Sequence, residues 1–560
     1  MRACDIRPLA STIVKASLAV LMTVQTPMQL LAQSLPAPAA TALPTGGQVA
    51  AGRAAITQGG TAANPALTIR QDSARAVINW NSFDIGQSAK VDFIQPDSQS
   101  VALNRVQGSN PSRIFGQLTA NGQVYLVNPN GVYFSPTSTA DVGGLVATTM
   151  GMSDADFIAG RNTFTRNGAT GKVINEGTLT SRNGGYIALL APEVRNAGVI
   201  VAQSGTVALA SGEAVTMNFD PANSLTNLIV APSTINALVD NQKIVKAPDG
   251  KVIVSAQAFN DMTQGVIKNS GTMSAKGISK SGGEIVLGAS TAIANDGTIK
   301  AKSTAGNGGT VRLDAKTVSQ TGTIDVSTTA TGGKGGLVMV TGDLLALKAG
   351  STIAANGPAG GGTVLVGGDW QGSNGVRQAQ SVVAEQGASI SANATQGGDG
   401  GKVVLWSDIT KPDGFTKFDG TIEAKGLAGG NGGRVETSGH VIDVSNGSIN
   451  VKSGGGDNGL WLIDPYNVTI ANSASSSGTP FSSNFTADTT SSISVLSVQN
   501  MLNAGTDITI STGAVGSPGA DPGSITVSAP ISKTAGSSAT LTLFAASFIA
   551  INRDITSTSG

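Results

Sequence analysis

Apolar and polar residues alternate along most of this chain in short runs. The runs are rich in Val, Ile and Thr and are bounded by Gly, Asn, Asp and Ser, as is typical of β-strands. Helical periodicity is weak, and the best candidate for a helix is the segment 495–502. The pattern therefore predicts an all-β protein.

The strand pattern repeats. A Gly-Gly pair opens an apolar strand at six places, which begin at Gly282, Gly308, Gly335, Gly361, Gly400 and Gly432. These pairs are 26, 27, 26, 39 and 32 residues apart, and a second strand motif follows most of them. Short strands that cannot bury an apolar face alone must stack on copies of themselves. The repeat predicts a right-handed parallel β-helix with one coil per unit. A β-propeller is the alternative, but its blade signatures are missing.

One segment stands out from the repeats, residues 121–134, with the sequence NGQVYLVNPNGVYF. Two apolar runs flank Asn128-Pro129-Asn130-Gly131, which fits a type I turn with Asn first, Pro second and Gly fourth. The segment predicts a strand, a turn and a strand. It lies in a head that holds half of the 22 aromatic residues, between Trp80 and Phe219.

The N-terminus is typical of a secretory signal. Basic residues precede a mostly apolar stretch at 16–24, which is too short to span a membrane. We expect residues 1–32 to be a signal peptide, with an uncleaved anchor as the alternative, and 33–45 to be a linker. Cys4 would leave with the signal, so disulfides, cysteine zinc sites and cysteine nucleophiles are excluded. No later stretch is apolar enough to predict a stable membrane span.

Charge and candidate chemistry narrow the function. The chain has 35 basic and 35 acidic residues, so no basic face predicts nucleic acid as a partner. The single histidine, His440, has no acidic cluster around it in sequence, and no catalytic, phosphate-binding or metal-binding motif is found. Scattered carboxylates are the remaining catalytic candidates: Asp314, Asp325, Asp343, Asp369, Asp399 and Asp408. We predict a protein that is not an enzyme and has no cofactor.

Motifs in the head occur in a fixed order. They are Asn104-Arg105-Val106, Gly116, Asn121-Gly122, the turn at 128–131 and Gly143-Gly144. In this combination the head resembles the secretion domain of filamentous haemagglutinin-like exoproteins, the secreted partners of two-partner secretion systems. One place departs from the family, because Gln95-Pro96-Asp97-Ser98 stands where its members often carry Asn-Pro-Asn-Leu.

The resemblance implies a β-helix with an N-terminal cap, which is recognised by periplasmic domains of an outer-membrane transporter and exported through it. It implies residues 46–220 as the secretion domain. The repeats themselves predict a Gly-rich β-helix at 221–456, and the change in pattern after them predicts a further β-rich module at 457–560, which we expect to belong to a longer product. The candidate secretion residues are Asn104, Arg105, Asn128, Pro129, Asn130 and Gly131. They could contact the transporter or only shape the cap.

We therefore expect an exoprotein that reaches the surface or surroundings of a Gram-negative bacterium through the periplasm. Its expected role is adhesion or another surface interaction, with an unidentified receptor. Two alternatives are a secreted polysaccharide-active β-helix enzyme and an autotransporter passenger. The enzyme would need its carboxylates on one face of adjacent coils.

Overall fold

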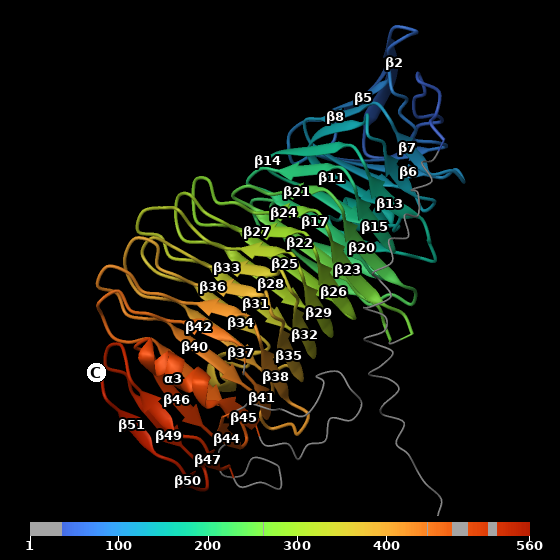
Figure 1. The fold of residues 1–560 in the computed structure, drawn as a ribbon. Coiled ribbons are helices and arrows are strands. Elements are labelled where there is room, and N and C mark those ends of the chain that lie inside the picture. Colours follow the sequence, from blue (N-terminus) through green and yellow to red (C-terminus); the bar gives the residue numbers. More distant parts are fainter. Residues whose placement is uncertain (1–35, 261, 445, 473–490, 513–522, 560) are drawn as a thin grey trace, which may run out of the picture.

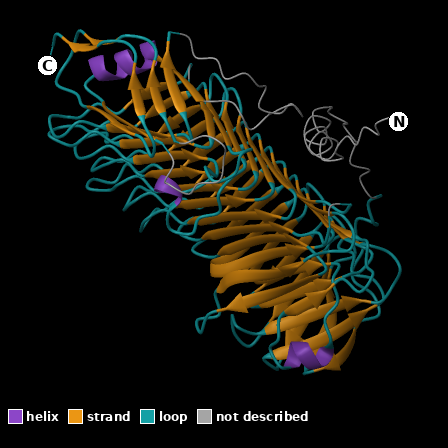
Figure 2. Cartoon of the chain, turned by 90° about the horizontal axis from the view of Figure 1, so that it is seen from below, coloured by secondary structure: helices purple, strands orange, loops and turns teal. Residues whose placement is uncertain are grey.

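The chain winds into a long stack of β-strand coils, a parallel β-helix (Figures 1 and 2). This computed structural model describes residues 36–260, 262–444, 446–472, 491–512 and 523–559. The predicted signal peptide at 1–32 lies outside the described residues. The predicted fold is confirmed, and each Gly-Gly pair of the repeats does open a strand.

Three faces, named A, B and C here, make up the coils, and the chain passes through them in the order B, A, C. Face A consists of β1 (Gln48–Ala51), β4 (Arg75–Trp80), β6 (Val101–Val106), β9 (Gln123–Val127), β17 (Thr206–Ser211), β22 (Lys251–Ala256), β25 (Glu284–Ala289), β28 (Thr310–Asp314), β31 (Leu337–Thr341), β34 (Thr363–Val366), β37 (Lys402–Trp406), β40 (Arg434–Ser438), β43 (Leu460–Asp464), β46 (Asp507–Ser511) and β49 (Leu541–Phe544). Face B consists of β2 (Ala54–Gly60), β3 (Pro65–Gln71), β5 (Lys90–Ile94), β8 (Gln117–Ala120), β16 (Val199–Ala202), β21 (Ile244–Lys246), β24 (Thr272–Ser274), β27 (Thr298–Lys300), β30 (Thr323–Asp325), β33 (Thr352–Ala354), β36 (Ser389–Ser391), β39 (Thr421–Glu423) and β42 (Ser448–Asn450).

Two long strands, β11 (Thr139–Thr148) and β14 (Thr178–Leu190), belong to both faces and join them into one 30-stranded sheet. Face C is a separate 16-stranded sheet. It consists of β7 (Ser112–Ile114), β10 (Val132–Phe134), β13 (Lys172–Asn175), β15 (Glu193–Asn196), β20 (Ala237–Asn241), β23 (Gly265–Asn269), β26 (Ala292–Asn295), β29 (Thr317–Gln320), β32 (Leu344–Leu347), β35 (Ser381–Ala384), β38 (Phe415–Phe418), β41 (Val441–Asp443), β44 (Val468–Ala471), β45 (Ser491–Ser494), β47 (Ile525–Val527) and β50 (Ile549–Ile551).

Side chains alternate between the inside and the outside of the coil along each strand, as the period of two requires. The inward residues stack on equivalents in neighbouring coils, as Ile285, Val311, Val338 and Val364 do along face A. These layers form one apolar core that runs through the coils. Burial of an apolar face that a single coil could not cover stabilises the stack.

The Gly-Gly pairs lie at the corner between faces B and A, where the backbones of successive coils touch. A Cβ on Gly361 would collide with the carbonyl oxygen of Ala392 and lie 2.5 Å from the amide nitrogen of Gly401. Gly308 and Gly335 meet the next coil in the same way. None of these glycines has a positive φ. The pairs are thus needed for close approach of the coils and not for an unusual backbone conformation.

A ladder of buried side-chain amides follows the corner between faces C and B. The amide of each residue donates to the side-chain oxygen of the next coil at 2.7–2.8 Å, through Asn175, Asn196, Asn241, Asn269, Asn295 and Gln320. All six side chains are buried. The ladder satisfies polar groups inside the core and aligns successive coils, because a shift in register would break its hydrogen bonds.

Replacement of Asn241 by alanine is expected to loosen the coils around it. The change removes the donor to Asn269 and the acceptor of Asn196, and buried groups without partners cost about 1–3 kcal/mol each. Hydrogen exchange of β20 and β23 should accelerate, whereas Asn227→Ala, at an exposed position, should leave exchange unchanged. Equal exchange in the two variants would contradict a stabilising role for the ladder.

Insertions leave the coils at the third corner, between faces A and C, and two of them fold back over the outside of face A. The first carries α2 (Asp154–Ile158) and β12 (Thr163–Thr165), and the second carries β18 (Ala214–Phe219) and β19 (Leu225–Ala231). Strands β12, β18 and β19 form a small antiparallel sheet. A second apolar cluster lies beneath this layer and includes Tyr125, Phe157, Phe164 and Tyr186. The aromatic head is therefore divided, because Trp80, Phe83 and Phe93 lie inside the coils instead.

The N-terminal end of the stack is capped by the antiparallel hairpin β2–β3. Residues 40–45, within the segment assigned to a linker, already pack there: Ser88 donates to the carbonyl of Ala40, and Leu43 contacts the core.

The stack of coils continues across residues 221 and 457, where the sequence predicts domain boundaries, because strands on either side of each position pair with one another. The predicted helix near the C-terminal end is confirmed as α3 (Val495–Asn503), beside the two-stranded sheet of β48 (Ile531–Lys533) and β51 (Ile555–Ser557). Among the described residues, no helix has the length and apolarity needed to cross a membrane.

Candidate functional site

The candidate secretion turn lies at the corner between faces A and C, where it joins β9 to β10. The amide of Gly131 donates to the carbonyl of Asn128 at 3.0 Å, which closes the predicted four-residue turn. Gly131 has a φ of +125°, a conformation that other residues rarely adopt. The strand–turn–strand prediction for this segment is thus confirmed.

Asn128 is fully buried and holds three segments together. Its side-chain nitrogen donates to the carbonyl of Asn110 and to the hydroxyl of Ser112, both at 3.0 Å. Its side-chain oxygen accepts from the backbone of Asn130 at 3.0 Å, an Asx turn within the larger turn. In the folded domain Asn128 is therefore a structural residue that no partner protein can reach.

Pro129 and Asn130 are exposed at the tip of the same turn. The side chain of Asn130 donates to the carbonyl of Gly108 in the preceding coil at 2.9 Å. In the following coil Gly171 packs so closely on this turn that a Cβ there would lie 2.5 Å from the carbonyl oxygen of Pro129. Turns of three coils are thereby stacked into one exposed surface, called the turn strip here, which consists of Gln107, Ser109, Asn110, Pro129, Asn130 and Thr170.

Asn104 and Arg105 are neighbours on β6 and point in opposite directions. Asn104 is buried inside the coil, where its side-chain oxygen accepts from the indole nitrogen of Trp80 at 3.0 Å. Arg105 points outward and pairs with Asp154 at 2.7 Å and with the carbonyl of Met152 at 2.8 Å. Asn104 thus satisfies a buried tryptophan. Arg105 anchors the start of α2, and neither residue belongs to the turn strip.

Gln95, where the sequence departs from the family, has a structural role that sequence reasoning missed. It is buried, and its side-chain nitrogen donates to the carbonyls of Ser100 at 2.9 Å and Gln123 at 3.1 Å. Its backbone exchanges two hydrogen bonds of 2.7 Å with the side chain of Asn121. The next polar residue, Asp97, accepts from the Ser100 hydroxyl, which lowers the pKa of that carboxyl. The Pro-Asp pair after Gln95 was the available signal for such a turn.

A buried polar network connects the coils to the outer layer. The hydroxyl of Tyr186 lies 2.6 Å from the side-chain oxygen of Gln123 and 3.1 Å from the hydroxyl of Tyr125. Tyr125 in turn lies 3.4 Å from the side-chain oxygen of Asn162, which precedes β12. Burial raises the pKa of both tyrosines, so they remain neutral hydrogen-bonding groups.

Each of the scattered carboxylates has a structural partner, and two of them share one. Arg377 binds both Asp314 and Asp343. Asp325 pairs with Lys302, Asp369 with Lys402 and Asp408 with Lys411, whereas Asp399 accepts from the backbone amide of Asn431.

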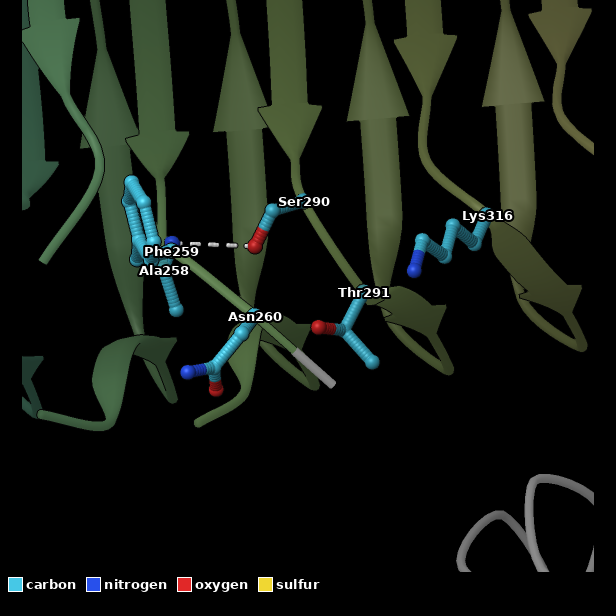
Figure 3. Close-up of a pocket in the computed structure, with 6 residues that line it drawn as sticks. All are labelled: Ala258, Phe259, Asn260, Ser290, Thr291 and Lys316. Atoms are coloured by element: carbon cyan, nitrogen blue, oxygen red, sulfur yellow. Dashed lines mark hydrogen bonds between the residues drawn. The ribbon is translucent and has the colours of Figure 1, made fainter. Parts of the chain in front are cut away.

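A shallow hollow of about 330 Å³ lies at the corner between faces A and C, where the chain leaves β22, β25 and β28. It is lined by Ala258, Phe259, Asn260, Ser290, Thr291 and Lys316 (Figure 3). That lining contains no carboxylate for acid–base catalysis.

Comparison with known proteins places these features in a family. The family model described as "TPS secretion domain" matches residues 40–301. The heme/hemopexin-binding protein of Haemophilus influenzae strain Rd is 35% identical over 254 residues, which are 44% of this chain and 27% of that protein. A second heme/hemopexin-binding protein of Haemophilus influenzae is 34% identical over 247 residues, 40% of this chain and 26% of its own length. The chain thus matches about a quarter of the length of these relatives.

A solved structure agrees with the sequence matches. The secretion domain of HMW1 from Haemophilus influenzae superimposes with a TM-score of 0.56 at 29% identity, and the match covers 75% of this chain and all of that one. The family match begins before the predicted start of the secretion domain and ends well beyond residue 220. Residues 40–301 of this chain thus match the TPS secretion domain model, and the fold agrees with that of a solved secretion domain.

Proposed function

We propose that this chain is an exoprotein that a two-partner outer-membrane transporter exports from the periplasm, and that the turn strip is the surface the transporter recognises. The observation that carries the proposal is the arrangement around Asn128. A fully buried amide holds together turns whose tips, Pro129 and Asn130, are exposed within a TPS secretion domain. Asn128 thus fixes the shape of a surface that the exposed residues present.

The rest of the molecule suits this route. A coil stack can fold progressively from one end, since each coil contacts mainly its neighbours. The one cysteine, Cys4, lies in the predicted signal peptide, so no disulfide would lock the mature chain before translocation. Once outside, the β-helix is a rigid shaft suited to adhesion or another surface interaction. In this proposal the chain is a binding and display protein without catalytic activity.

Export is expected to depend on the transporter. The full chain with its N-terminal segment is expressed with and without a candidate outer-membrane transporter, and its amount outside the cell is measured by immunoblotting. The chain should be found outside only in cells with the transporter, and should remain periplasmic and be degraded without it. A deletion of 40–301 that leaves the signal in place is the matched control and should stay inside. Equal export with and without the transporter would contradict the proposal.

A further inference from the structure

A third insertion covers the outside of face A, beyond residue 301, where the match to the secretion domain ends. Between β34 and β35 the chain leaves the corner at Gly367 and returns at Ala379, whose amide donates to the carbonyl of Gly367 at 2.8 Å. This loop, called the strap here, is the reason for the irregular spacing of 39 residues between two Gly-Gly pairs. It contains the short helix η1 (Trp370–Gly372).

The strap packs around Trp406, which projects outward from β37 and is buried. The indole nitrogen of Trp406 donates to the side chain of Gln378 at 2.9 Å, and the backbone at Gly368 lies directly against the indole ring. Trp406 belongs to a small apolar cluster with Leu365 and Val404, separate from the core of the coils. The strap therefore covers an apolar patch that would otherwise face solvent.

Contacts of the strap extend over five successive coils of face A. Toward the N-terminal end, Arg377 pairs with Asp314, the last residue of β28, and with Asp343, which follows β31. Toward the C-terminal end, Asp369 pairs with Lys402 of β37 at 2.7 Å, and the Trp370 ring lies 4.5 Å beneath the guanidinium of Arg434 on β40. The strap is thus fastened at both ends, along the stacking direction of the coils.

Two carboxyl groups are buried at the C-terminal end of the strap without a cation. Glu436 of β40 is fully buried, and its oxygens accept from the backbone amide of Gln371 at 2.9 Å and from the hydroxyl of Ser438 at 3.0 Å. Asp464 of β43 lies beside them, since its amide donates to the same hydroxyl at 3.2 Å. Among the described residues, one side-chain oxygen of Asp464 has no hydrogen-bond partner, and the residue is only 7% exposed. A buried carboxylate with only neutral donors is costly.

We propose that the strap is a proton-operated clasp. It stays closed over face A while the buried carboxyls of Glu436 and Asp464 carry protons, and it opens when they ionise, which uncovers Trp406 and its apolar neighbours. Gln371 is the residue through which the strap covers Glu436. Its amide donates to the carboxyl and so favours the ionised form, but burial is the larger effect and favours the protonated form. Opening would expose this apolar patch of the shaft without unfolding the coils beneath.

The direction of the pH response follows from burial. Burial raises the pKa of Glu436 from its ordinary 4.5 to about 8 and that of Asp464 from 3.8 to about 7. A carboxyl whose pKa is higher in the closed state favours that state at low pH, and the advantage is lost as the pH rises through the raised pKa. The clasp should be tightest near pH 4.5 and open around pH 7–8.

Other charged groups around Glu436 do not reverse this direction. Lys402 is paired with Asp369, Lys411 with Asp408, and His440 stacks on Tyr466 with its Nδ1 atom 2.9 Å from the carbonyl oxygen of Ile409. The guanidinium of Arg434 is engaged with the ring of Trp370. The charged and titratable groups near the clasp are thus Asp369, Lys402, Asp408, Lys411, Arg434, His440 and Asp464.

Hydrogen exchange of the full chain tests the clasp. Amides of residues 367–379, corrected for intrinsic exchange, should lose protection on the order of tenfold or more between about pH 5 and about pH 9. In the double variant Glu436→Gln with Asp464→Asn, protection should stay constant over this range, because neither side chain ionises. Glu385→Gln, at a carboxylate paired with Lys348 on another corner, is the matched control and should respond like the natural chain.

Either of two results would overturn the clasp: equal protection of the strap at both pH values in the natural chain, or an unchanged pH response in the double variant. If the double variant does not fold, the single variant Glu436→Gln replaces it, since Glu436 is the carboxyl that contacts the strap. Its strap should lose most of the pH response, and an unchanged response in this variant would likewise contradict the clasp.

Discussion

Replacement of Asn128 by alanine is expected to reduce the exported protein on the order of tenfold or more. The change leaves the carbonyl of Asn110, the hydroxyl of Ser112 and the amide of Asn130 without their partner. Each buried group left unpaired costs about 1–3 kcal/mol, so the stack of turns should lose its fixed shape. The measurement is the amount of chain outside transporter-bearing cells, compared with hydrogen exchange of residues 107–112 and 128–132 in the purified protein.

Two further variants separate shape from contact. Pro129→Ala changes an exposed residue of the turn strip and should lower export while leaving hydrogen exchange of the buried turn near that of the natural chain. Asn552→Ala, an exposed position outside the secretion domain, is the control and should change neither quantity. Normal export of Asn128→Ala would show that the shape of the turn strip has no part in secretion. Normal export of Pro129→Ala, with reduced export of Asn128→Ala, would contradict a contact between Pro129 and the transporter and leave only the structural role of Asn128.

Replacement of Gly361 by alanine is expected to destabilise the shaft by about 3–5 kcal/mol around the altered coil. The added Cβ would collide with the carbonyl oxygen of Ala392 and crowd the amide nitrogen of Gly401. Both are backbone atoms, which cannot rotate away as a side chain could. Relief requires the two coils to separate, which breaks hydrogen bonds between them, such as those from the amide of Gly361 to the carbonyl of Asp399 and from the amide of Lys402 to the carbonyl of Gly362. Hydrogen exchange of residues 355–366 and 392–405 should accelerate, while the secretion domain stays protected because coils interact mainly with their neighbours.

Gly288→Ala is the matched control for this prediction. The nearest atom to its new Cβ, the side-chain nitrogen of Gln257, would be 3.9 Å away, and the glycine lies in a β-strand of the same shaft. Its effect on exchange should be small. If Gly361→Ala and Gly288→Ala behaved alike, the Gly-Gly pairs would not be required for close approach of the coils.

Most of the fold followed from local patterns. The Gly-Gly pairs and the alternating strands predicted stacked coils, because a period of two and a repeat length are visible in the sequence itself. The turn at 128–131 was equally clear, since its residue types correspond to the φ and ψ of a type I turn. The helix α3 was also predicted within one residue of its observed end.

The roles of individual site residues could not be predicted in the same way. Asn104 and Arg105 are adjacent in sequence, yet one satisfies Trp80 inside the coil and the other holds α2 outside it. Gln95 departs from the family pattern but joins turns of different coils. Each role depends on which residues of other coils lie nearby, and that information is absent from a local motif.

The sequence by itself determined the β-helix and the turn at 128–131, because periodicity and turn chemistry act over short distances along the chain. Only the tertiary structure decided what each corner of the coil does. The corner between faces B and A brings backbones together, the corner between C and B carries the amide ladder, and the corner between A and C holds the turn strip and the strap. The position of Glu436 beneath the strap was likewise decided by the tertiary structure. Glu436 meets Gln371, 65 residues away in sequence, through the stacking of the coils.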